Sequence, residues 1–143
     1  MSSPLTVWTG APTVIDSSVA FKWLDPSESG SESAVEMLRK HQRDEIALVA
    51  PAHLPLEVLN VLVSRHADPD EVQEAVGFLA DAELLIAPLD DTLLAEAARI
   101  AFAERIALYD AAFIALAALL DAPLVTADRR QASTTACEVR LIG

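Results

Sequence analysis

A long apolar segment that contains a single acidic residue constrains the fold of this chain more than any other feature. In residues 106–120 the only charged residue is Asp110, and most of the others are Ala, Leu, Ile and Phe. This composition predicts a helix that is buried on all sides. An Ala-Pro step after Asp121 would end the helix. Residues 124–127 would then follow as a short buried strand that ends at Asp128.

The predicted helix and strand have matching lengths. A helix of about eleven residues rises ~17 Å at ~1.5 Å per residue, and a strand of about five residues at ~3.3 Å each covers the same distance. Asp110 and Asp128 are therefore predicted to lie at the same edge of the fold. An ionised carboxylate in apolar surroundings costs free energy unless another group compensates its charge.

Two more acids occupy similar positions earlier in the chain. Residues 13–16 predict a short buried strand closed by Asp16, the only charged residue among the first 21. Residues 46–50 predict a second strand, and Glu57 lies about one turn into the helix that follows. Groups just beyond the carboxyl ends of parallel strands share one crevice. All four acids are therefore expected to face that crevice.

The alternation of short strands with helices predicts a single α/β domain. We expect a three-layer α/β/α sandwich around a central, mainly parallel sheet of four or five strands. Further strands are predicted at residues 84–87 and 138–142, and a capping box at residues 29–32 predicts the start of another helix. Residues 1–12 are interpreted as a loose leader, and residues 13–143 as the domain.

Charge and cysteine content exclude several classes of protein. The formal net charge of −12 argues against a protein that binds nucleic acid through a broad basic face. The single cysteine, Cys137, rules out an internal disulfide framework and fits a reducing compartment. Neither a signal peptide nor a membrane-spanning segment is visible, so a soluble, cytoplasmic protein is expected.

The four acids have different meanings singly and together. Taken singly, each fits a helix cap, the start of a turn or an exposed helix position. Taken together they repel one another, because two carboxylates ~5 Å apart at an effective dielectric of 20 repel by about 3 kcal/mol. A hard cation would compensate this repulsion, and donors that are all oxygen favour Mg²⁺ or Mn²⁺ over zinc. Such ions suit phosphodiester hydrolysis because they activate water and stabilise the leaving oxygen.

Four sequence motifs carry a resemblance to a known family. They are VIDSSVAFKW with Asp16, PAHLPLEVLNVL with Glu57, YDAAFIALA with Asp110 and LVTAD with Asp128. In this order and spacing, the chain resembles PIN-domain ribonucleases, and within that family VapC-type toxins of type II toxin–antitoxin pairs. The segment after Asp128 lacks the aromatic residue that commonly follows in the family.

This resemblance implies a function and a set of partners. It implies Mg²⁺- or Mn²⁺-dependent endoribonuclease activity, homodimerisation, and inhibition by a cognate antitoxin protein that covers the crevice. The acidic surface argues for a structured RNA substrate, such as tRNA or rRNA, over general RNA degradation. No small-molecule cofactor and no membrane partner are expected.

The resemblance also implies roles for individual residues. Asp16 and Asp110 would hold the principal metal, Glu57 would complete its shell directly or through water, and Asp128 would support the site or a second ion. Ser17 and Thr126 would orient a carboxylate or a water. Two explanations stay open for Arg129 and Arg130, which either contact RNA phosphate or neutralise Asp128.

Other residues and functions receive simpler interpretations. Lys22 is expected to face solvent, and His41, His53 and His66 are interpreted as structural or surface residues. One alternative function is a catalytically silent PIN-like module that binds a partner. Another is a different Mg²⁺-dependent phosphate hydrolase, which the lack of a glycine-rich phosphate loop argues against.

Overall fold

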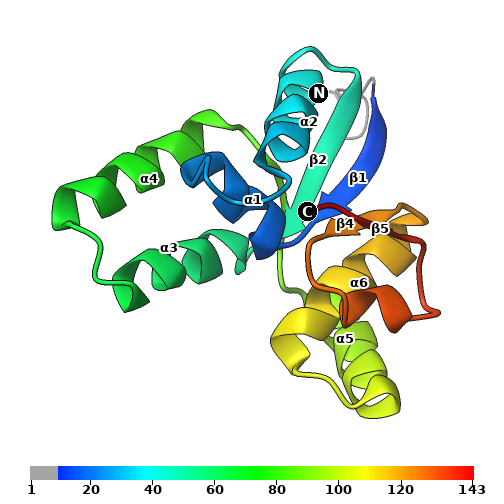
Figure 1. The fold of residues 1–143 in the computed structure, drawn as a ribbon. Helices are drawn as coiled ribbons and strands as arrows, with labels where there is room; N and C mark the ends of the chain where they lie inside the picture. The colour runs from blue at the N-terminus through cyan, green and yellow to red at the C-terminus, as the bar shows by residue number, and fades with distance from the viewer. Residues whose placement is uncertain (1–9) are drawn as a thin grey trace.

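The computed structural model describes residues 10–143 and contains a five-stranded sheet in the order β3-β2-β1-β4-β5 (Figure 1). Every pair of neighbouring strands is parallel. The strands are β1 (Ala11–Ile15), β2 (Ile46–Pro51), β3 (Leu85–Ala87), β4 (Leu124–Thr126) and β5 (Val139–Leu141). The predicted parallel α/β fold is therefore confirmed.

The helices form a layer on each face of the sheet. They are α1 (Ser17–Leu24), α2 (Ser31–Gln42), α3 (Leu54–Ser64), α4 (Pro69–Asp81), α5 (Asp91–Glu104) and α6 (Leu108–Leu120), with a 3₁₀ turn at Gln131–Ser133. Right-handed crossovers place α1 and α2 on one face, where they pack against β1, β2 and β4. The return to β4 runs in the opposite direction and places α5 and α6 on the other face. Figure 1 shows α3 and α4 packed together as an arm that extends from the sheet.

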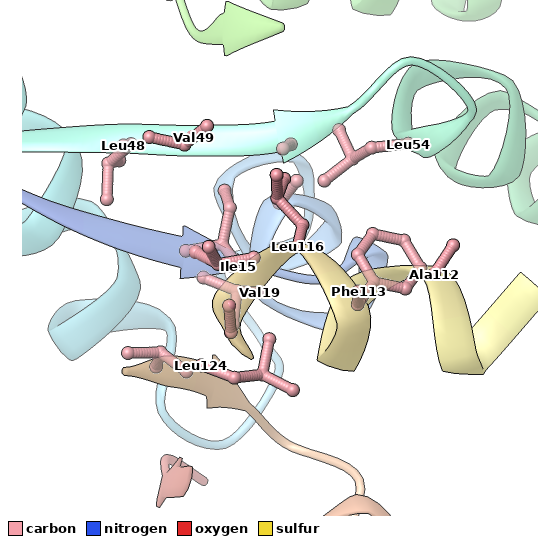
Figure 2. Close-up of a cluster of buried hydrophobic side chains, with 14 of the residues drawn as sticks. Ile15, Val19, Leu48, Val49, Leu54, Ala112, Phe113, Leu116 and Leu124 are labelled. Carbon is pink, nitrogen blue, oxygen red and sulfur yellow. The ribbon is translucent and has the colours of Figure 1, made fainter. Parts of the chain in front are cut away.

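The core fills both faces of the sheet, as a parallel sheet requires. Figure 2 shows side chains from β1, β2, β4, α1, α3 and α6 meeting in one cluster. They include Ile15, Leu48, Leu124, Val19, Leu54, Phe113 and Leu116. No helix in the described part of the chain combines the length and the apolar character needed to cross a membrane.

Helix α6 is the buried helix that the apolar segment predicts. Its residues from Ala111 to Ala117 are all buried. The helix begins two residues later than residue 106, because Arg105 closes α5 in a left-handed conformation with φ of 56°. It ends at Leu120, where Asp121 adopts φ of 51°. Strand β4 then returns along the sheet, as predicted, and ends at Thr126.

The amino-terminal boundary of the domain differs from the predicted one. Strand β1 begins at Ala11, and Ala11 and Pro12 pair with Ile46 and Ala47 of β2. These two residues belong to the sheet and not to a loose leader. The remainder of the predicted leader, residues 1–9, lies outside the described residues.

The predicted capping box before α2 is wrong. The N-cap of α2 is Gly30, with φ of 82° and no side-chain capping bond. A Cβ atom at Gly30 would lie 2.7 Å from the backbone nitrogen of Gly143, so the close approach of this distant backbone requires glycine. The Ser31 hydroxyl donates instead to the carbonyl of Pro26.

The prediction that Lys22 faces solvent is also wrong. Its side chain is buried, and its Nζ lies 3.2 Å from Oε1 of Glu28. The turn between α1 and α2 brings Glu28 back over the end of α1 and thereby supplies the charge that a buried lysine needs.

Truncating a core side chain of β2 tests the described packing. Leu48 is fully buried, so Leu48→Ala is expected to lower the free energy of unfolding by about 2–5 kcal/mol. Leu56 is 72% exposed, and the control Leu56→Ala is expected to change stability by less than about 0.5 kcal/mol. Urea denaturation of both variants measures the difference, and equal losses would contradict the packing described here.

Candidate active site at the carboxyl edge of the sheet

The topology of the sheet brings the predicted acids to one edge. The chain leaves β1 toward β2 and β3 and later returns to β4 on the other side of β1. The carboxyl edge between β1 and β4 is therefore the switch point where open parallel sheets bind ligands. Asp16 follows β1 directly, and Asp128 lies just beyond β4. Glu57 and Asp110 lie in the first turns of α3 and α6.

Asp16 is held by hydrogen bonds on both carboxylate oxygens. Its Oδ1 accepts bonds from the Ser18 backbone at 3.1 Å and the Ser18 hydroxyl at 2.5 Å. Its Oδ2 accepts a bond of 2.5 Å from the Thr126 hydroxyl. Burial raises the pKa of Asp16, and the bonds from Ser18 and Thr126 act in the opposite direction. The carboxylate is fixed in place and also caps α1.

Two hydroxyls join the end of β1 to the segment after β4. Thr126 donates to Asp16 and accepts a bond of 2.9 Å from the Asp128 backbone. The Ser18 hydroxyl accepts a bond of 2.9 Å from the backbone of Ala127. Thr126 thus orients a carboxylate, as proposed from the sequence, whereas the part played by Ser18 was missed. The signal for Ser18 was the second serine directly after Asp16.

Glu57 is held by the other serine of this pair. Its Oε1 accepts a bond of 2.9 Å from the Ser17 hydroxyl, so α1 and α3 are linked beside Asp16. Its Oε2 lies 4.0 Å from Nε2 of His53. The side chain is 27% exposed, which leaves room for a ligand. No hydrogen bond within residues 10–143 joins Glu57 directly to another of the four acids.

Asp110 and Asp128 influence each other electrostatically. Burial raises the pKa of Asp110, and the neighbouring Asp128 carboxylate raises it further, while Arg130 and a protonated His53 act in the opposite direction. Burial alone would also raise the pKa of Asp128, but hydrogen bonds from Arg130 outweigh it and lower that pKa. The two acids are therefore a coupled pair with different surroundings.

Arg130 is the partner of Asp128. Its Nε and a terminal guanidinium nitrogen lie 3.3 and 3.1 Å from the two carboxylate oxygens, and its backbone nitrogen donates at 2.9 Å. Arg129 is exposed and makes no ion pair with the rest of the described chain. Of the two explanations for these arginines, neutralisation of Asp128 matches the geometry of Arg130 and not that of Arg129.

The donor set can be compared with the needs of a divalent cation. Within residues 10–143, no group of three or more His, Cys, Asp and Glu side chains converges closely enough to hold a metal. Mg²⁺ is commonly bound by only one or two carboxylates, with waters and substrate phosphates completing its shell. Asp110 accepts no hydrogen bond from the described residues. The described residues therefore form no closed metal cage, and only an open site with one or two carboxylate ligands would match this arrangement.

The chain belongs to the PIN domain family. The family model matches residues 13–136, which include all four acids. No match was found among curated proteins.

Solved structures of toxin–antitoxin proteins share this fold. VapBC2 from Rickettsia felis, bound to a promoter DNA fragment, is 12% identical with a TM-score of 0.71, covering 92% of this chain and 99% of its own. VapBC-5 from Mycobacterium tuberculosis is 23% identical with a TM-score of 0.58, and the match covers 92% of this chain and 98% of that chain. VapC20 from the same organism, a sarcin–ricin loop cleaving toxin, is 12% identical with a TM-score of 0.62. The match covers 78% of this chain and 86% of that chain.

Removing the charge of Asp110 tests the coupled acid pair. Because the folded-state pKa of Asp110 is raised, its ionised form destabilises the metal-free protein once the pH rises through that pKa. Asp110→Asn is therefore expected to stabilise the metal-free protein at neutral pH by up to about 1 kcal/mol, the scale of partly exposed charge interactions. The gain should shrink as the pH falls into the carboxyl range. Thermal unfolding from pH 4 to 8 measures it, and a gain that grows toward low pH would contradict this account.

Proposed function

We propose that this chain is a VapC-type toxin, a divalent-metal-dependent endoribonuclease that hydrolyses phosphodiester bonds in structured RNA. The observation that carries the proposal is the placement of Asp16, Asp110 and Asp128 around the β1–β4 switch point, with Glu57 held beside Asp16 by Ser17. Membership of the PIN domain family and the shared fold of toxin structures support it.

Each of these side chains would have a separate role in binding the metal or orienting its ligands. Asp16 and Asp110 would hold Mg²⁺ or Mn²⁺, with Glu57 and Asp128 as further or water-mediated ligands. When bound, such an ion supplies activated water and stabilises the leaving oxygen. Thr126 and Ser17 keep the carboxylates of Asp16 and Glu57 in fixed orientations, so that these ligands need no reorganisation.

Asp110 would act closest to the reacting atoms. Its half-buried carboxylate accepts no hydrogen bond from the described residues, in contrast to Asp16, Glu57 and Asp128. A water held by this carboxylate would attack the phosphorus, forming a new P–O bond as the bond to the leaving oxygen breaks. The water would pass its proton to the Asp110 carboxylate, and a solvent water would protonate the leaving oxygen. The oxygens of Asp110, which accept no hydrogen bond from the described residues, suit it both to orient that water and to coordinate a cation.

The charge of the protein bears on its substrate. With a net charge of −12, the chain has few cations to hold RNA, so local contacts must supply binding. Arg129 and Arg130, directly after Asp128, would be such contacts. Recognition of a folded shape, in tRNA or rRNA, needs fewer phosphate contacts than a long electrostatic groove.

Protein partners are part of the proposal. Phe102 is 88% exposed and Tyr109 is 68% exposed, and Tyr109 is the neighbour of Asp110. Exposed apolar side chains of this size favour contact with another protein. A cognate antitoxin that covers the acidic edge of the sheet and a homodimer are proposed on this basis. A cytoplasmic location is proposed because the single cysteine fits a reducing compartment. The fold is shared with toxin–antitoxin proteins, including a complex from Klebsiella pneumoniae.

A catalytically silent PIN-like binding module is the second candidate. The lack of a converging three-ligand group within residues 10–143 favours it. It differs from the first candidate in one respect that is simple to measure, namely whether RNA is cleaved.

Cleavage assays with tRNA and rRNA decide between the two candidates. Cleavage is expected in Mg²⁺ or Mn²⁺ and not in EDTA, and Asp110→Asn or Asp16→Asn should reduce the rate by about 100-fold or more, as for loss of a positioned catalytic group. Asp121→Asn is the matched control, because Asp121 lies in a left-handed conformation at the far end of α6 and asparagine tolerates that conformation. Cleavage that survives both site substitutions would remove the site assignment, and no cleavage of any RNA would favour the binding module.

Arg130 provides a second test of the acid pair. A cation seated on Asp128 competes with a metal ion, so Arg130→Gln is expected to bind Mn²⁺ up to about fivefold more tightly, equivalent to ~1 kcal/mol. Arg129→Gln, the control, should bind Mn²⁺ like the wild type. Isothermal titration calorimetry measures both, and equal affinities for the two variants would show that Arg130 does not compete.

A further inference from the structure

His53 joins the helices that carry two of the acids. It is the N-cap residue of α3, and its side chain is only 11% exposed. Its Nε2 lies 2.9 Å from the carbonyl oxygen of Tyr109 in the first turn of α6, and its ring centroid is 4.6 Å from that of Phe113. Within the described residues, this is the only hydrogen bond between residues 53–64 and residues 108–120.

The hydrogen bond determines which ring nitrogen carries the proton. A carbonyl oxygen only accepts, so the Nε2 atom of His53 must donate to Tyr109. The Nδ1 atom is buried and has no partner within residues 10–143, and a proton there would be an unpaired buried donor. When the ring is neutral, the geometry therefore favours the tautomer with Nε2–H. The hydrogen bond to Tyr109 gives His53 a positional contact with the site.

The contact acts on the backbone that carries Asp110. The Tyr109 carbonyl belongs to the peptide group whose nitrogen is that of Asp110, so holding this oxygen holds the base of the Asp110 side chain. On the other side, His53 is one helical turn before Glu57, whose carboxylate the Ser17 hydroxyl already fixes. The bond therefore sets how far the first turn of α6 lies from the first turn of α3.

We propose that His53 is a positioning residue that fixes Asp110 relative to Glu57 by holding the Tyr109 carbonyl. The importance of this spacing for a metal ion rests on the proposed function. Ligands of a divalent cation must be held within about 0.5 Å of their working geometry by the residues around them. Without His53, the first turn of α6 loses its hydrogen-bonded link to α3.

Three variants separate a positioning role from a merely structural one. His53→Leu fills the space and removes the donor, while His53→Gln keeps a donor that reaches the same carbonyl. His41→Leu is the matched control: Nε2 of His41 lies 2.9 Å from the Glu83 carbonyl oxygen, and its Nδ1 accepts a bond of 3.0 Å from Leu48. His41 lies toward the amino ends of the strands, away from the acids.

We would measure the Mn²⁺ affinity of each variant by calorimetry. Urea unfolding and amide hydrogen exchange would be measured on the metal-free proteins. His53→Leu is expected to weaken Mn²⁺ binding by about tenfold, the usual scale for loss of a residue that orients metal ligands. It should also speed exchange at residues 111–113, and His53→Gln should restore most of both. His41→Leu should lower stability but leave Mn²⁺ affinity and exchange at residues 111–113 unchanged.

The outcomes distinguish this inference from the proposed function. If the wild type binds Mn²⁺ and His53→Leu binds it equally well, or if His53→Leu and His41→Leu lose affinity equally, the positioning role is overturned. If the wild type binds no Mn²⁺, the proposed function loses its metal, and exchange alone then decides. Faster exchange at residues 111–113 in His53→Leu that His53→Gln reverses supports the inference, and unchanged exchange overturns it.

Discussion

The burial of one carboxylate, that of Asp16, is the interaction on which the rest of the site depends. Burying a carboxylate is unfavourable unless donors replace the lost water, and here hydroxyls from Ser18 and Thr126 do so on both oxygens. Because Thr126 ends β4 and Asp16 follows β1, the bond between them extends the pairing of these strands beyond their last backbone contact. Thr126 also binds the Asp128 backbone, so the position of the last acid follows from that of the first.

The four acids have distinct surroundings, and this difference suggests distinct roles. Asp16 is bound on both oxygens, Glu57 on one, and Asp128 is paired with Arg130. Asp110 is half-buried beside Asp128 and accepts no hydrogen bond from the described residues, and Arg130 acts on it only electrostatically. Hydrogen-bond donors of the described chain thus contact three of the acids and leave Asp110 without one. A site that must accept an ion or a water needs such an open group on an otherwise rigid frame.

The sequence was sufficient where local pattern decides the structure and insufficient where distant contacts do. The apolar segment predicted α6 and the return to β4, because a helix with no polar face can only be buried. Lys22 and the start of α2 were mispredicted because the deciding partners, Glu28 across a turn and Gly143 at the other end of the chain, are set by the tertiary fold. His53 was interpreted as a structural or surface residue, and its contact with α6 could not be predicted because its partner is a backbone carbonyl that carries no side-chain signal.

Arg130 links the charge of the site to the charge of the whole protein. A chain with net charge −12 repels RNA, yet one of its few arginines is paired with Asp128. Under the proposed function, a divalent ion that engages Asp128 would displace this guanidinium and release it toward a substrate phosphate. Metal binding and RNA binding would then be thermodynamically coupled, since each favours the state in which Arg130 has left the carboxylate. The acidity of the protein would in this way restrict RNA binding to the metal-loaded site.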